Sequence, residues 1–337
     1  MHRILCREIS FFFGDAMFIP LFIRVFAIFF IIALGALARK LKFLDIHTAK
    51  RTAVIITNFF YPALIFSSLT SNFTLQKLAS HWILPAATFG IMAIGYFAGI
   101  AIRDFFRFSS PSSRNVFLFQ TTINNYSFLP MPIILMYWGD AGIALLIFST
   151  LGSEIAVWTL GILGLTGNTF KKENLRHLFS MPMLALFAAI IVLCLKAAGV
   201  GTWLGSCGSF FPEISASLIT SLDMFGKAAI PLAMFVAGSR LLDVHISEIF
   251  HPAQFGIAGI RLLFVPAVAI ALLMALPISK EILPVLATVA VMPCAIASVV
   301  LSETYGADAE YAAAGVFLTH LFSLMTIPAW LTLVMRH

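Results

Sequence analysis

Asn124, Asn125 and Tyr126 belong to a polar cluster within an apolar stretch of the chain and are the residues best suited to hold a polar ligand. Their amide and hydroxyl groups can donate hydrogen bonds to an anion such as a carboxylate. Pro130 and Pro132 follow within a few residues. Because proline lacks a backbone N–H and clashes with the carbonyl four residues earlier, this pattern predicts a broken helix with polar side chains at the break.

Pro293, Cys294 and Ala295 form a second interruption, at the corresponding place in the second half of the chain. Two such breaks would each present a half-helix N-terminus with free N–H groups and a positive dipole, and ends of this kind bind anions. A simple proline kink is the alternative for either break alone. The matched pair favours an anion site, which we predict at these three residues and the polar run of the first break.

The elements around both breaks are predicted to be membrane helices. The chain has 337 residues, of which 61% are hydrophobic and 11% are charged, whereas a soluble domain carries about 25% charged residues. About 20 apolar residues span the hydrocarbon, and the backbone must bond to itself in lipid. The predicted spans are 18–38, 53–70, 82–102, 115–138, 141–165, 180–200, 214–239, 254–276, 281–302 and 310–334.

The second five spans repeat motifs of the first five. YPALIF at 61–66 corresponds to IPLAMF at 230–235, and YWGDA at 137–141 corresponds to YGADA at 305–309. An odd number of spans in each copy inserts the copies in opposite orientations, which is typical of secondary transporters. The sequence therefore predicts an all-α membrane protein with ten transmembrane helices in two inverted five-helix repeats.

Four segments follow from this division. Residues 1–17 lack the pattern of a cleaved signal peptide and are interpreted as a short extension. Residues 18–165 form the first repeat, 166–179 a cytoplasmic connection and 180–337 the second repeat.

Basic residues are unevenly distributed between the predicted connections. Connections after odd-numbered spans hold 12 of them: Arg39, Lys40, Lys42, Lys50, Arg51, Arg103, Arg107, Arg114, Lys171, Lys172, Arg176 and Arg240. The opposite side holds 6: Arg3, Arg7, Lys77, Lys196, Lys280 and Arg336. Since positive residues stay cytoplasmic, we expect both termini to be extracytoplasmic. The membrane would be the plasma membrane, which is the inner membrane in a bacterium. The net charge of +6 requires no nucleic-acid partner.

The ordered set of motifs resembles the auxin efflux carrier family, which contains plant PIN transporters and bacterial malonate and malate permeases. The resemblance runs from about Phe18 to Val334 and is carried by 61–66, 125–132 and the closing run 292–330. It implies that broken helices 4 and 9 cross at the centre and move against a scaffold of spans 1, 2, 6 and 7. It also implies an organic anion as the substrate.

Two positions depart from the plant members of that family. Asn124 stands where they have a crossover proline, and Cys294-Ala295 replaces their Gln-Gly. These differences imply a different pocket and argue against auxin itself as the substrate.

Asp223 and Lys227 lie one helical turn apart in span 7 and share a face. They form either a structural ion pair near the membrane edge or, alternatively, a cavity site in which Lys227 attracts a carboxylate. Both are kept as candidates for charge coupling.

Glu154 and His320 are ionisable residues inside predicted spans, where a charge is costly unless it is paired. Glu154 is expected to pair with Arg24 or Arg261. In the alternative, it carries a proton, because burial favours the neutral carboxyl. His320 is expected to be a hydrogen-bonded core residue rather than a proton carrier.

The function that these features favour is secondary transport of a mono- or dicarboxylate by alternating access. The partners are this small anion and the lipid bilayer, and a homodimer is compatible with the sequence. No enzyme constellation, metal-ligand spacing or cofactor motif is present, so the sequence predicts no catalytic residue, metal or cofactor. The alternatives are a sodium-coupled transporter similar to bile-acid symporters, a channel, and a receptor or structural protein. Sodium sites need several oxygen ligands, and the breaks contain no acidic residue.

Overall fold

The computed structural model describes residues 18–167, 179–200, 210–240 and 246–336. The predicted extension 1–17 and most of the predicted connection 166–179 lie outside the described residues. Helices make up most of the described part, and its strand-like pairing is limited to one isolated antiparallel bridge between Asn124 and Cys294. This agrees with an all-α fold.

The helices follow one another along the chain with short connections. They are α2 (Phe18–Lys40), α3 (Ile46–Ile55), η1 (Ile56–Phe60), α4 (Tyr61–Asn72), α5 (Leu75–Ser80), α6 (Ile83–Ile102), η2 (Arg103–Phe105), α7 (Pro111–Thr122), α8 (Pro130–Ala156), η3 (Val157–Gly161), α9 (Ile162–Leu165), α10 (Met181–Ala197), α12 (Phe210–Lys227), α13 (Ala229–Arg240), α14 (Ile246–Ile249), α15 (Pro252–Gly259), η5 (Ile260–Phe264), α16 (Val265–Ala275), α17 (Leu283–Ala290), α18 (Ala297–Thr304) and α19 (Ala309–Met335).

Seven helical segments among the described residues are long and apolar enough to cross a membrane. They are Phe18–Lys40, Ile46–Asn72, Leu75–Phe105, Pro130–Leu165, Pro212–Arg240, Pro252–Ala275 and Ala309–Met335. The protein is therefore a multi-pass membrane protein. The arrangement as ten helices in inverted repeats stays a prediction.

Three local features account for the difference between seven and ten. The predicted spans 115–138 and 281–302 are each divided by a break into short helices. The predicted spans 115–138 and 141–165 are not separated by a loop, because α8 runs through their boundary with a sharp kink at Gly139 (φ 59°, ψ −157°). Glycine adopts this conformation at no steric cost. The predicted span 180–200 contains the shorter apolar helix Met181–Ala197.

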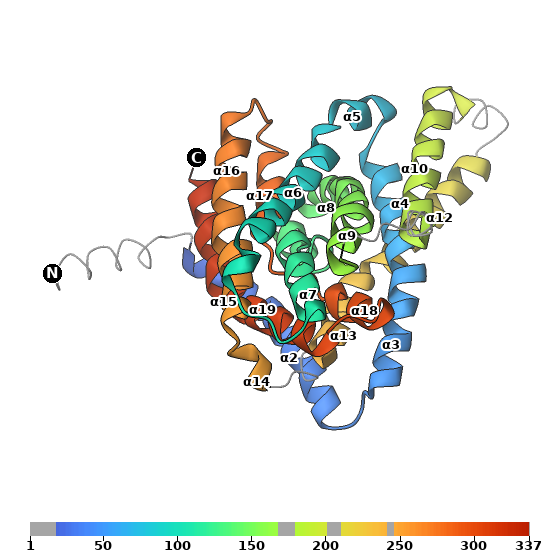
Figure 1. Ribbon diagram of the computed structural model, residues 1–337. Coiled ribbons are helices and arrows are strands. Elements are labelled where there is room, and N and C mark those ends of the chain that lie inside the picture. The colour runs from blue at the N-terminus through green and yellow to red at the C-terminus, as the bar shows by residue number, and fades with distance from the viewer. Residues whose placement is uncertain (1–17, 168–178, 201–209, 241–245, 337) are drawn as a thin grey trace.

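Two groups of helices surround the broken ones (Figure 1). On one side, α2 packs against α13, while α4 lies between α10 and α12. On the other side, α15, α16 and α19 lie together, and α6 packs against both α7 and α8. The breaks therefore lie in the interior of the bundle.

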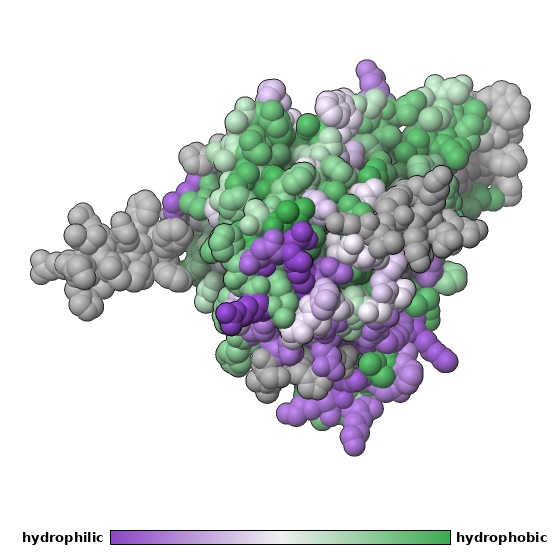
Figure 2. All heavy atoms as spheres, viewed as in Figure 1, coloured by the Kyte–Doolittle hydropathy of each residue, from purple (hydrophilic) through white to green (hydrophobic). Residues whose placement is uncertain are grey.

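The outer surface suits a lipid environment. Figure 2 shows apolar residues over the upper part of the bundle and hydrophilic residues gathered toward the end at which α2 connects to α3. Large apolar side chains on the outer helices are exposed, including Ile23, Phe26 and Phe30 of α2 and Ile191 of α10. Contiguous exposed apolar surface of this kind is typical of contact with a membrane.

Candidate functional site

The two breaks meet backbone to backbone. The amide of Asn125 donates to the carbonyl of Pro293 at 2.8 Å, and the amide of Ala295 donates to the carbonyl of Ile123 at 3.0 Å. These two bonds join the segment after α7 to the segment after α17, and we call this pairing the joint. Residues 124–126 and 293–295, which the sequence singles out, are thereby brought together.

Asn124 fills the gap that Pro293 leaves in helix α17. A residue with an N–H at 293 would continue the helix by bonding to the carbonyl of Val289, four residues earlier. The side-chain amide of Asn124 donates to that carbonyl instead, at 2.5 Å. Its nitrogen is therefore engaged by the protein rather than free for a substrate.

Asn125 is held more loosely, by two long contacts. Its Nδ2 lies 3.4 Å from Nε2 of His320, and its Oδ1 accepts from the amide of Leu129 at 3.4 Å. Nδ1 of His320 lies 2.8 Å from the carbonyl of Val316. Nδ1 must therefore carry the proton, which leaves Nε2 to accept from Asn125. His320 is accordingly a neutral, hydrogen-bonded residue of the interior.

Cys294 also has a partner within the bundle. Its Sγ lies 2.9 Å from Oγ1 of Thr319, and its side chain is fully buried. No group of three or more His, Cys, Asp or Glu residues that could hold a metal ion occurs in the described ranges.

Tyr126 connects the first break to Glu154. The Tyr126 hydroxyl donates to Oε1 of Glu154 at 2.8 Å, and the Trp158 indole donates to Oε2 at 3.2 Å. Both oxygens of the carboxyl therefore have neutral donors. The carboxyl touches the break itself, 28 residues earlier in the chain.

The ion pair that we expected for Glu154 is wrong for the described part of the chain. The guanidinium of Arg24 lies over the ring of Tyr137, 4.6 Å from its centroid. Arg261 donates instead to the carbonyls of Thr121 and Thr122. The pair does not form because the carboxyl of Glu154 contacts Tyr126, whereas the side chains of Arg24 and Arg261 contact other residues.

The expectation of free N–H groups at the start of α8 is also wrong. Pro130 and Pro132 have no N–H, and the amide of Met131 donates to the carbonyl of Ser127 at 3.3 Å. The prolines that interrupt the helix thus remove the donors that an anion would need. At the start of α18, the amide of Ser298 donates to the carbonyl of Ala295 at 3.0 Å, and the amide of Val299 donates to the carbonyl of Ile296 at 3.2 Å.

Comparison with known families agrees with this architecture. A sequence model of the family described as "Membrane transport protein" matches residues 20–180 and again residues 171–331. The chain belongs to this family. The resemblance to auxin efflux carriers is thereby confirmed.

Two archaeal relatives of this membrane transport protein cover nearly its whole length. An uncharacterized transporter of Methanocaldococcus jannaschii is 25% identical over 315 residues, which are 91% of this chain and 96% of the relative. An uncharacterized transporter of Methanothermobacter thermautotrophicus is 23% identical over 310 residues, with the same coverage of 91% and 96%.

Lys227 of this transport protein forms ion pairs at the end of α12. Its Nζ lies 2.9 Å from Asp223, one turn earlier, and 3.0 Å from Asp140, directly after the Gly139 kink. The geometry corresponds to the ion-pair alternative, extended by a second carboxylate that the sequence analysis missed. Lys227 is therefore not an unpaired charge beside the joint.

Ion pairs also connect the second broken helix to neighbouring helices, and sequence reasoning missed these pairs as well. Glu303, near the end of α18, lies 2.7 Å from Lys50 of α3 and 3.2 Å from Arg240 of α13. The repeat did not indicate this contact, because Asp140 corresponds to Asp308 in the motifs at 137–141 and 305–309, whereas Glu303 lies just before the second motif.

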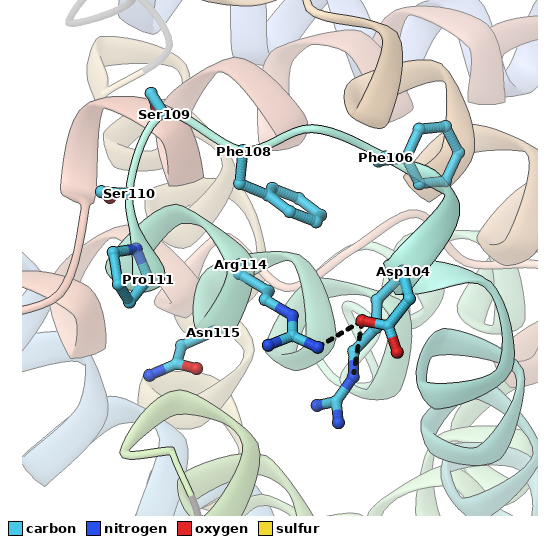
Figure 3. A pocket seen from close by; sticks show the side chains of 9 residues that line it. Asp104, Phe106, Phe108, Ser109, Ser110, Pro111, Arg114 and Asn115 are labelled. Carbon is cyan, nitrogen blue, oxygen red and sulfur yellow. Dashed lines mark hydrogen bonds and ion pairs between the residues drawn. The ribbon is translucent and has the colours of Figure 1, made fainter.

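A pocket of about 510 Å³ lies where α6 connects to α7, away from the joint (Figure 3). Its lining residues are Arg103, Asp104, Phe106, Phe108, Ser109, Ser110, Pro111, Arg114 and Asn115. Asp104 forms ion pairs with both arginines, so the positive charge is partly neutralised. The rest of α7, residues 116–122, separates this lining from the break by about 10 Å along the helix axis.

Proposed function

We propose that this protein is a secondary transporter of a small organic anion, a mono- or dicarboxylate, working by alternating access at the joint. The observation that carries the proposal is the meeting of two broken helices in the interior of the bundle. Irregular backbone in a membrane is tolerated where it is buried in protein or lines a water-filled cavity. Transporters bind substrate at such discontinuous helices. Family membership supports transport, and the polar groups at the joint support an anion.

The packing supports a division into a moving part and a scaffold. The joint ties α7–α8 to α17–α18, so that the two breaks would move as one unit. Outside this unit, α2 packs against α13, and α4 packs against α10 and α12, while the contacts of α2 with α19 and of α4 with α8 lie between the two parts. In the ten-helix arrangement α2, α4, α10 and α12–α13 are spans 1, 2, 6 and 7, which we assign to the scaffold.

Uptake of radiolabelled mono- and dicarboxylates into proteoliposomes tests this function. The pH gradient, sodium gradient and voltage are imposed one at a time, with liposomes lacking the protein as the control. Saturable uptake or exchange of a carboxylate is the expected result. Folded protein that neither takes up nor exchanges any of these anions would reject the proposal.

The proposed topology makes a direct prediction. A reporter fused after Arg336 should be active only in the extracytoplasmic space, because the basic connections gather on the other side. In Figure 1, α19 ends opposite the basic connection between α2 and α3. Activity of the reporter in the cytoplasm would reverse the orientation.

Asn125 has a polar side chain next to the joint, and we expect this side chain to contact the substrate. Its two contacts are long, so exchanging them for a carboxylate costs little. Asn125→Ala should weaken substrate binding by about 1–3 kcal/mol, the range for a lost hydrogen bond to a charged group. This corresponds to a loss of affinity of roughly five- to 150-fold, measurable from the concentration dependence of uptake.

Asn58→Ala is the matched control, because the Asn58 amide donates to the Val54 carbonyl within its own helix. It should leave the affinity unchanged. If the well-folded Asn125→Ala protein keeps the wild-type affinity, Asn125 does not belong to the binding site.

A further inference from the structure

Arg261 is a fully buried arginine without a carboxylate partner among the described residues. It lies in the π-helical turn η5, in the middle of the span Pro252–Ala275. One nitrogen, Nη1, donates to the carbonyls of Thr121 and Thr122 at 3.3 and 3.4 Å. These residues end α7, directly before the first break.

The contact of Nη1 with these two carbonyls has a clear structural role. The last carbonyls of a helix lack partners within the helix, and a cation is favourable at that end because of the helix dipole. Gly95 of α6 makes the approach possible, since a Cβ there would overlap the Thr121 carbonyl and lie 3.1 Å from Nη1. Nη1 of Arg261 thus caps α7.

The other two nitrogens of the guanidinium have no such role. Nε and Nη2 are buried and have no hydrogen-bond acceptor within the described residues. Arginine remains charged in proteins, and leaving a buried charge without a partner is strongly unfavourable. Both oxygens of Glu154, an acidic residue of α8, already accept from Tyr126 and Trp158.

The position of the two unused nitrogens indicates what they bind. Nε and Nη2 lie on one edge of the planar guanidinium, with their N–H bonds parallel. This edge matches the two oxygens of a carboxylate, which accept from arginine in a bidentate manner. A single water molecule would leave part of the charge uncompensated.

We propose that Arg261 binds the carboxylate of the transported anion through Nε and Nη2, while Nη1 remains on the end of α7. This inference rests on the proposed function and adds two statements to it. It assigns the cation of the site, and it limits the substrate to one carboxylate. Arg240 is the other buried arginine among the described residues, and it is paired with Glu303. A second carboxylate would therefore meet no cation in the interior.

Equilibrium binding to the purified full-length protein tests this assignment. The probes are radiolabelled butyrate and phenylacetate, with succinate, butyramide and phenylacetamide as competitors. The variants are Arg261→Lys, which keeps the charge but not the two-pronged edge, and Arg261→Gln. Arg24→Gln is the control, because Arg24 is an arginine of another span that lies over the Tyr137 ring. Thermal unfolding without ligand checks that each variant is folded.

Wild-type protein should bind a monocarboxylate about tenfold or more tightly than succinate or the matching amide. Arg261→Lys should lose about tenfold or more of that affinity. Arg261→Gln should also lose the preference of carboxylate over amide, while Arg24→Gln should keep both the affinity and the preference. If folded Arg261→Lys and Arg261→Gln keep the wild-type affinity for monocarboxylates and the preference over amides, Arg261 only caps α7. This result would overturn the inference about Arg261 but not the proposed transport function. Succinate binding as tightly as butyrate would overturn the limit to one carboxylate. Wild-type protein that binds none of the carboxylates would reject the proposed function, and this inference with it.

Discussion

Replacing Glu154 by glutamine should leave exchange of labelled substrate intact and abolish accumulation driven by a pH gradient. Glutamine mimics the permanently neutral carboxyl, so a cycle that must release the proton stops, while exchange does not require that release. The structure gives Glu154 neutral donors, Tyr126 and Trp158. Removing its charge therefore strands no arginine within the described residues.

The loss of stability should accordingly be small. Breaking a buried ion pair costs about 3–5 kcal/mol, whereas a changed neutral hydrogen bond costs about 1 kcal/mol. Thermal unfolding and membrane abundance of Glu154→Gln should thus stay close to wild type. Accumulation ratios with and without a pH gradient provide the transport measurement.

Glu281→Gln serves as the control, since Glu281 is an exposed carboxylate before α17. It should transport like the wild type. A Glu154→Gln protein that still accumulates substrate in response to a pH gradient would exclude Glu154 as the proton carrier. Collapse of abundance would instead assign it a structural role.

Pro293→Ala should abolish transport without lowering the amount of protein in the membrane. An alanine at 293 regains an N–H, which can bond to the Val289 carbonyl and displace the Asn124 amide. Alanine is favoured over proline inside a helix by about 3 kcal/mol. The two bonds of the joint contribute about 1 kcal/mol each, so extension of α17 through the break should win. The measurement is uptake per molecule of membrane-inserted protein.

Pro328→Ala is the matched control, because Pro328 lies inside the continuous helix α19. Replacing Pro328 does not alter either helix break. Transport should therefore stay within about twofold of wild type, because substitutions away from a functional site have small effects. If Pro293→Ala also transports normally, Pro293 is a passive kink and the open helix is not required.

The positions of the breaks could be predicted from the sequence, because proline acts locally. Pro130 and Pro132 begin α8, and Pro293 lies between α17 and α18. The same local rule also contained the correction at α8, since a proline at the start of a helix supplies no N–H. Proline therefore predicts both the position of the break and the absence of N–H donors at the start of α8.

The partners of the buried charges could not be predicted in this way. Glu154 and Tyr126 meet because α8 folds back beside the break, and Arg261 meets the end of α7 across a gap made by Gly95. Both contacts depend on how helices pack in three dimensions. Sequence spacing alone could list the candidates for pairing but not choose between them.

The joint consists of main-chain groups alone, and this has a consequence for how such proteins can diversify. The amides of Asn125 and Ala295 and the carbonyls of Ile123 and Pro293 form it, whereas the amides of Asn124 and Cys294 take no part. A proline at 124, as in the plant proteins, would cost no bond of the joint. Ile123 already has the extended conformation (φ −98°, ψ 120°) that a residue before proline adopts. The joint can therefore carry different side chains at its two facing positions, so that the chemistry around the breaks can change while the main-chain pairing that joins them is kept.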